Sequence, residues 1–227
     1  MNWYLETLYK IIVRPILFFT DMPRGTWQED ALSFAMVTGW ILSFAITVVL
    51  FINSYMPTGL SLIEGIYGRK LVIILPVLAI MGFAFFAMTL LIIGGLLILA
   101  VIGLFVVCAA VLNFLLVLLG GSGNIFEVVK ATLYCSAAIL AGLLNIFLLI
   151  AVKYKVMSAA NWIIGENVIF LAASVFLYGL FAILGRKTHN VPRWKAFLAA
   201  TVPFIILLVI NVILSMKVLP KVMSIFG

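Results

Sequence analysis

The chain contains one very long stretch without a charge: the 56 residues from 71 to 126 carry no charged side chain. Within it, 71–119 consists almost entirely of Leu, Ile, Val, Phe, Ala and Gly. A helix needs about 20 such residues to cross a bilayer, so the stretch is more than twice the required length. Because hydrocarbon offers the backbone no hydrogen-bond partner, the stretch must be helical. The pattern therefore predicts an all-α integral membrane protein.

Turn-forming residues divide the hydrophobic chain into lengths that suit single membrane spans. The strongest signals are Gly94-Gly95 and the run Gly120-Gly121-Ser122-Gly123. The pattern predicts six hydrophobic helices, at 31–52, 71–93, 96–119, 129–152, 163–184 and 196–216. Between the first two, residues 53–70 are expected to form an interfacial connection. Small residues at Ala35 and Gly39 predict close packing between helices. The expected architecture is a polytopic transmembrane helical bundle.

The first 25 residues are interpreted as a separate interfacial segment, followed by one transmembrane helical domain at 26–227. Within 3–19, apolar residues recur at helical spacing, while Glu6, Lys10 and Arg14 form a polar stripe. An amphipathic helix of this kind lies in the plane of the membrane interface. Packing of the same helix on the cytosolic end of the bundle is the alternative. Polar residues precede the first long apolar run, so no cleavable signal is expected.

The distribution of Lys and Arg favours five crossings over six. With the N-terminus inside, six crossings place seven basic residues on each side, whereas five crossings place eight inside and six outside. The five-crossing topology puts the N-terminus and the 185–195 loop in the cytoplasm. It leaves 71–93 as one extra hydrophobic helix, re-entrant, interfacial or spanning.

Composition agrees with a membrane protein and narrows its partners. The chain is 67% hydrophobic and 9% charged, whereas a soluble domain is about 25% charged. Its net charge of +7 lies in the connections and termini, where it meets anionic lipid headgroups, so nucleic acid is not expected as a partner. Cys108 and Cys135 both fall inside predicted spans, which argues against a disulfide framework or a zinc site.

Basic residues concentrate in the 185–195 loop, which is the strongest local constellation in the chain. Cations near an anionic membrane surface contribute about 1 kcal/mol each to binding. The candidate lipid- or partner-binding residues are Lys10, Arg14, Arg186, Lys187, Arg193, Trp194 and Lys195. The simpler interpretation of the loop is a topology signal without further function.

Polar side chains are rare in the middle of the predicted spans. The candidate intramembrane polar positions are Asn113, Tyr134, Asn145, Tyr178 and Asn211. Such groups commonly form hydrogen bonds between helices, and the alternative is a polar track for a small solute or a lipid headgroup. Charged residues such as Lys130 fall at predicted helix ends, where a solvated or capping role is expected. The sequence has no metal, nucleotide or hydrolase motif, so we expect neither an enzyme nor a cofactor.

Several short motifs occur in a characteristic order along nearly the whole chain. They are Arg14-Pro15-x-x-Phe18-Phe19, Leu118-Leu119-Gly120-Gly121-Ser122-Gly123, Tyr134-Cys135-Ser136 and Trp194-Lys195-Ala196. This order resembles the Yip domain family of Ypt/Rab-interacting membrane proteins, and particularly its prokaryotic branch. The resemblance implies five transmembrane helices and a cytosolic N-terminus. Eukaryotic members are implicated in vesicle traffic and bind small GTPases, whereas for prokaryotic members the resemblance implies no defined activity.

The sequence thus leads to two functional hypotheses. The first is a non-enzymatic, membrane-organising scaffold or adaptor that binds anionic lipids and a membrane or cytosolic protein partner. It would lie in a prokaryotic inner membrane, with a homo-oligomer as one option. The second is a small transporter, channel or lipid-translocating protein that uses the intramembrane polar positions.

Overall fold

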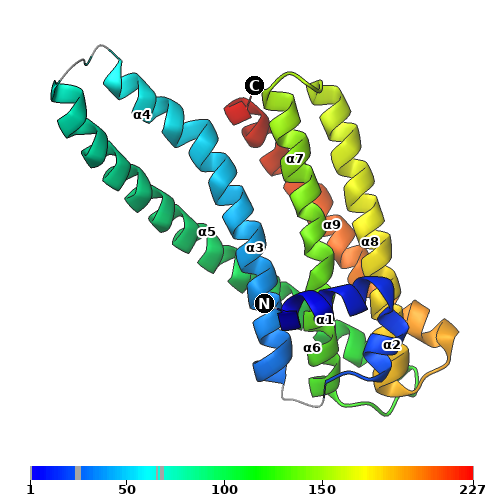
Figure 1. Ribbon diagram of the computed structural model, residues 1–227. Helices are drawn as coiled ribbons and strands as arrows, with labels where there is room; N and C mark the ends of the chain where they lie inside the picture. Colours follow the sequence, from blue (N-terminus) through cyan, green and yellow to red (C-terminus); the bar gives the residue numbers. More distant parts are fainter. Residues whose placement is uncertain (1, 24–26, 65, 67–68, 227) are drawn as a thin grey trace.

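The computed structural model describes residues 2–23, 27–64, 66 and 69–226, and every regular element in this part of the chain is a helix (Figure 1). The α-helices are α1 (Asn2–Val13), α2 (Pro15–Thr20), α3 (Leu32–Leu50), α4 (Met56–Ile63), α5 (Arg69–Leu118), α6 (Ile125–Tyr134), α7 (Gly142–Lys153), α8 (Ala159–His189) and α9 (Arg193–Phe226). Two π-helical turns, Trp27–Ala31 and Phe51–Tyr55, and a 3-10 segment, Cys135–Ala141, connect some of them without a break. The all-α prediction is confirmed.

Within the described residues, five helical stretches are long and apolar enough to cross a membrane, which confirms the predicted number of spans. They are Glu29–Ile63, Val72–Leu118, Ile125–Lys153, Ala160–His189 and Arg193–Ile213. Successive spans run in opposite directions between two ends of the bundle (Figure 1). We call the end with α1, α2 and the α8–α9 corner the base, and the end with the α7–α8 connection the distal end.

The structure corrects the predicted boundary at Gly94-Gly95, because α5 is one helix of 50 residues. Residues 71–93 are therefore the first half of the second span and not an extra, separate helix. Gly94 serves packing instead of a turn: a Cβ atom there would lie 2.5 Å from the Trp40 ring of α3. At 1.5 Å per residue α5 is about 75 Å long, against about 30 Å of hydrocarbon, so it is much longer than a single crossing requires.

Two predicted connections are also shorter than expected. The first span continues through the turn Phe51–Tyr55 into α4, whose first turn contains Pro57. Of the 185–195 loop, only 190–192 lie outside helices. The chain reverses there because Asn190 ends α8 in the left-handed conformation, with φ of 53°.

The N-terminal segment packs on the base of the bundle. It forms two helices instead of one, since Pro15 disfavours a helical conformation at the preceding Arg14. Tyr4 is buried, stacks on Phe34 of α3 with ring centroids 4.9 Å apart, and shares a 3.0 Å hydrogen bond with Thr38. The predicted domain boundary between 25 and 26 falls outside the described residues and stays a prediction.

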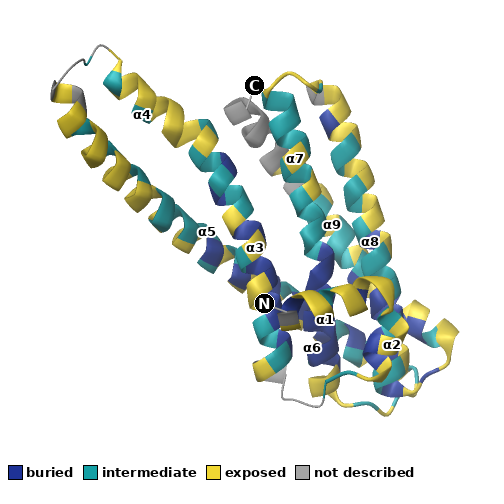
Figure 2. Ribbon diagram, viewed as in Figure 1, coloured by how far each residue is buried: buried dark blue, intermediate teal, exposed yellow. Residues whose placement is uncertain are grey.

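Burial is concentrated at the base and decreases toward the distal end (Figure 2). The core centres on α6, where Val128, Ala131 and Leu133 are fully buried. Farther out, large apolar side chains of α5 such as Ile80 and Phe83 are 70% and 73% exposed. Exposed apolar surface on a membrane span is the surface that lipid covers. Because burial is concentrated at the base, the base is the part of the molecule in which side chains are held in fixed positions.

Candidate functional site

The α8–α9 corner at the base is fixed by close contacts with the turn that follows α5. A Cβ atom at Gly123 would collide with the carbonyl oxygen of Thr188, and one at Gly121 would lie 2.8 Å from the Cβ of His189. His189 is 1% exposed and lies against this glycine turn. The corner therefore depends on glycine in a turn far away in sequence.

Lys195 belongs to the same α8–α9 corner, where it makes a structural contact, and it does not join the other cations of the 185–195 loop. Its Nζ donates a 2.7 Å hydrogen bond to the carbonyl oxygen of Leu119, just past the end of α5. It also lies 5.7 Å from the centroid of the Trp194 ring, which is 63% exposed. Lys195 thus has a structural role that the other loop cations lack.

Arg186, Lys187 and Arg193 remain on the surface and surround a hollow of about 320 Å³. Its wall is completed by Asn190, Val191 and Pro192. Among the residues that the structure describes, no carboxylate forms an ion pair with any of these three cations, so none of them is neutralised. The hollow carries positive charge, because three cations and no carboxylate are among the described residues that line it.

A second hollow of about 320 Å³ adjoins the first and shares its three cations. Its other walls are apolar: Ile16 of α2, Ala182 and Ile183 of α8, and Phe197 of α9. We refer to the two hollows together as the basic groove. The groove combines a cationic part and a hydrocarbon-lined part in one surface feature.

Lys10 and Arg14 lie elsewhere, in a hollow of about 570 Å³ between the N-terminal helices. Lys10 pairs with Glu6 at 2.6 Å, and the hydrogen bond and positive charge of Lys10 hold the pKa of Glu6 below its usual value. Asp21 lines the same hollow. The two predicted cations are thus partly offset by carboxylates and do not join the basic groove.

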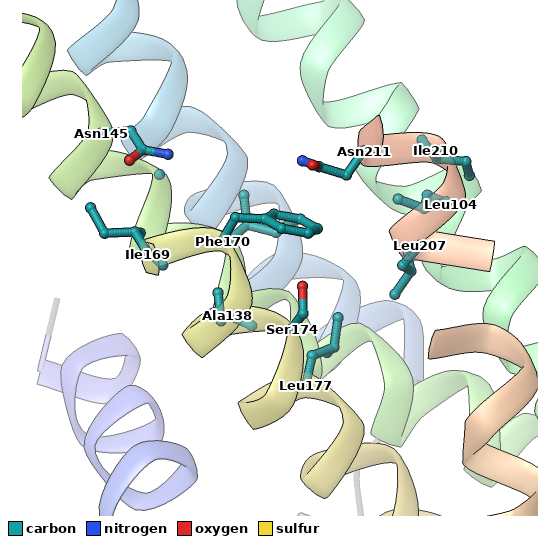
Figure 3. Close-up of a pocket in the computed structure, with 14 residues that line it drawn as sticks. Leu104, Ala138, Asn145, Ile169, Phe170, Ser174, Leu177, Leu207, Ile210 and Asn211 are labelled. Carbon is teal, nitrogen blue, oxygen red and sulfur yellow. The ribbon is translucent and has the colours of Figure 1, made fainter. Parts of the chain in front are cut away.

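The structure brings together two of the predicted intramembrane polar residues. Asn145 of α7 and Asn211 of α9 line a cavity of about 280 Å³, which is otherwise mostly apolar. Figure 3 shows their side chains pointing toward each other, with Phe170 and Ser174 of α8 between them. The buried Oδ1 of Asn145 has no hydrogen-bond partner among the described residues. An apolar cavity with a few converging polar groups is the usual form of a small-molecule site.

The other three predicted polar residues do not reach this cavity. The Tyr178 hydroxyl donates a 3.2 Å hydrogen bond to the Phe197 carbonyl and so joins α8 to α9, as expected of an interhelical bond. Tyr134 lies in the core of the base with its ring 5.0 Å from that of Phe18. Asn113 buries its Oδ1 on α5 without a hydrogen-bond partner among the described residues.

Lys130 is a polar residue whose role the sequence did not reveal. The prediction placed it at a solvated helix end, but it is 3% exposed and its Nζ donates to the carbonyl oxygen of Pro23. It therefore ties the chain after α2 to α6. In the sequence, the only indication of this role is a lysine among the apolar residues at the start of a helix. Its partner Pro23 is distant in sequence and is brought close by the tertiary fold alone.

The five alternating spans and the helical base define a polytopic α-helical membrane protein. Comparison with protein families finds a match to the Yip1 domain over residues 9–214. The match covers most of the chain, so the chain belongs to the Yip1 domain family of multi-span, generally non-enzymatic membrane trafficking proteins. Comparison with curated proteins and with solved structures gave no match.

Proposed function

We propose that this protein is a membrane-organising scaffold that gathers anionic lipid and protein partners at its base. The observation that carries the proposal is the group of three surface cations, Arg186, Lys187 and Arg193, which no described carboxylate neutralises. An uncompensated cation near an anionic membrane contributes about 1 kcal/mol to binding. Three of them on one corner make a preferred contact for headgroups or for acidic partner segments.

The outward face of α1 and α2 supports a location of the base at the membrane interface. Trp3, Tyr9, Ile12 and Leu17 are all exposed on these short helices. Aromatic and aliphatic side chains beside basic ones are typical of helices that lie on a membrane. The base would then hold the basic groove at the depth of the headgroups.

The charge distribution supports a cytoplasmic base. Five crossings place eight Lys and Arg residues on the side of the base and six on the distal side. The scaffold would accordingly receive cytosolic partners, in the inner membrane of a prokaryotic cell, alone or as a homo-oligomer.

The test compares lipids that stay with the purified protein after reconstitution in vesicles of phosphatidylcholine and phosphatidylglycerol. Wild type should retain phosphatidylglycerol above its bulk fraction, and the triple variant R186Q/K187Q/R193Q should lose most of that enrichment. About 1 kcal/mol per cation corresponds to about fivefold in affinity for each residue neutralised. The matched control, K70Q/K155Q/K217Q, removes three exposed cations from the distal end and should retain it. Equal enrichment in wild type and the triple variant would contradict the proposal.

The intramembrane cavity favours a second candidate function, the handling of a small polar solute or lipid. Asn145, Ser174 and Asn211 provide amide and hydroxyl groups within an apolar wall, and no charged residue lines the cavity. Flux or lipid scrambling in liposomes should then fall in N145L/N211L and persist in the control N113L, which changes an asparagine outside the cavity. Wild-type rates no higher than those of empty vesicles would eliminate this function.

A further inference from the structure

The basic groove has two chemically different parts that meet at the same three residues. Arg186, Lys187 and Arg193 line both the polar and the apolar hollow, each of about 320 Å³. Beyond the cations, the apolar part continues along Ile16, Ile183 and Phe197. Cationic side chains and apolar side chains thus line adjacent parts of one groove.

The polar part calls for an anion. Neither hollow is lined by Asp or Glu, and none of the three cations has an ion pair among the described residues. Arginine donors match phosphate oxygens in pairs, and lysine adds a point charge. A phosphate group therefore satisfies this part of the groove in both charge and hydrogen bonding.

The apolar part distinguishes a lipid from a soluble phosphate. Ile16 and Phe197 are 57% and 45% exposed, so apolar surface stands open directly beside the cations. Burial of apolar area contributes about 25 cal/mol per Å². An inorganic phosphate or a glycerol phosphate gains nothing from this surface, whereas an acyl chain attached to the same phosphate covers it.

The groove is also held in shape before any ligand arrives. Asn190 ends α8 at a defined left-handed residue, and Lys195 ties the first turn of α9 to Leu119. The two helix ends that carry Arg186, Lys187 and Arg193 are thereby fixed relative to each other. A preorganised site loses less ordering entropy on binding than a flexible cationic surface does.

We propose that one anionic phospholipid occupies the basic groove, with its phosphate among Arg186, Lys187 and Arg193. One acyl chain lies along Ile16, Ile183 and Phe197, between α2, α8 and α9. This inference rests on the proposed function and adds to it a single bound lipid of defined class. The bound lipid connects the N-terminal helix α2 to the last two spans.

The experiment is native mass spectrometry of the full chain, titrated separately with dioleoyl-phosphatidylglycerol, dioleoyl-phosphatidylcholine, dihexanoyl-phosphatidylglycerol and glycerol phosphate. One long-chain phosphatidylglycerol should bind at least about tenfold more tightly than the other three probes. R186Q/K187Q/R193Q should lose this preference. I16N/F197N, which makes the apolar wall polar at exposed positions, should lose the preference for long over short chains.

Matched controls change exposed apolar residues close in sequence to the two that are replaced. V13N/L198N alters two side chains that are 53% and 54% exposed and lie outside the groove lining, and it should bind like wild type. If glycerol phosphate or the short-chain lipid binds as tightly as the long-chain lipid, or if I16N/F197N behaves like wild type, the single-lipid site is overturned while the scaffold proposal stands. If wild type shows no preference for phosphatidylglycerol over phosphatidylcholine, both are overturned.

Discussion

The Nζ atom of Lys195 lies 2.7 Å from the carbonyl oxygen of Leu119 and donates a hydrogen bond to it. The carbonyls at a helix C-terminus lack intrahelical donors and carry partial negative charge, so a lysine is a suitable partner there. The bond joins the second span to the fifth across the base. It also brings together 118–123 and 194–196, two segments that carry the resemblance to the Yip family.

Replacing Lys195 should therefore weaken the fold more than replacing its neighbours. A hydrogen bond to a charged group contributes about 1.5–3 kcal/mol, so we expect K195M to lower the unfolding free energy by about that amount. Thermal unfolding of the detergent-solubilised protein measures the change, with K187M as the control in the same corner. Equal melting temperatures for K195M and K187M would contradict the structural role of Lys195.

Gly123 should tolerate no side chain. A Cβ atom would meet the Thr188 backbone and the His189 ring, and neither can move without opening the α8–α9 corner. We expect G123A to cost about 1–3 kcal/mol, in the range of an overpacked core. G103A, where nothing lies within 4 Å of the added atom, is the matched control and should be neutral or slightly stabilising. Denaturant or thermal unfolding compares the two.

The continuity of α5 predicts a simple pattern of cysteine accessibility. Single cysteines at Leu91 and Leu96 face lipid, so a membrane-impermeant maleimide should not label them. Cysteines at Lys70 and Ser122 should be labelled from opposite sides of the membrane, because one helix separates them. Native Cys108 and Cys135 are buried and should not be labelled. Labelling near Gly94-Gly95, or labelling of both ends from one side, would indicate the re-entrant arrangement.

Tyr4 should make the attachment of α1 sensitive to alkaline pH. Burial raises the pKa of Tyr4, and its hydrogen bond to Thr38 only partly opposes the shift. A raised folded-state pKa means that the neutral hydroxyl stabilises the fold below the ordinary pKa of 10.0, and that this contribution is lost as pH rises above it. Y4F should lack that part of the pH dependence, and at neutral pH it should lose about 0.5–1.5 kcal/mol for the hydrogen bond.

Unfolding of wild type and Y4F at pH 7 and at pH values above 10 tests this prediction, with Y9F as the exposed control. Parallel loss of stability in wild type and Y4F at high pH would show that Tyr4 is not the group responsible.

The sequence predicted the features that depend on composition along the chain. The hydrophobic lengths and the positions of Lys and Arg were enough for the helical class and the five spans. Gly94-Gly95 was misinterpreted because a glycine pair is equally a turn signal and a packing site. Only the position of Trp40 against Gly94 decides between them, and that position comes from the tertiary fold.

The same limit applies to the candidate sites: the sequence identifies the residues, and the tertiary fold decides their roles. The basic residues of the α8–α9 corner were recognised from their density, but nothing local separates Lys195 from Arg193. Their roles differ because the end of α5 lies beside one of them and not beside the other. Likewise Asn145 and Asn211 were recognised singly as polar residues within spans, and only the packing of α7 against α8 and α9 places them in one cavity.

The most direct test of the account is native mass spectrometry of the protein released gently from its own membranes, wild type beside R186Q/K187Q/R193Q. The account predicts that wild type carries anionic phospholipid or a stoichiometric protein partner, and that the triple variant loses it while K70Q/K155Q/K217Q keeps it. A wild type released without bound lipid or partner, or a triple variant that carries the same adducts as wild type, would contradict the assignment of the base as the functional surface.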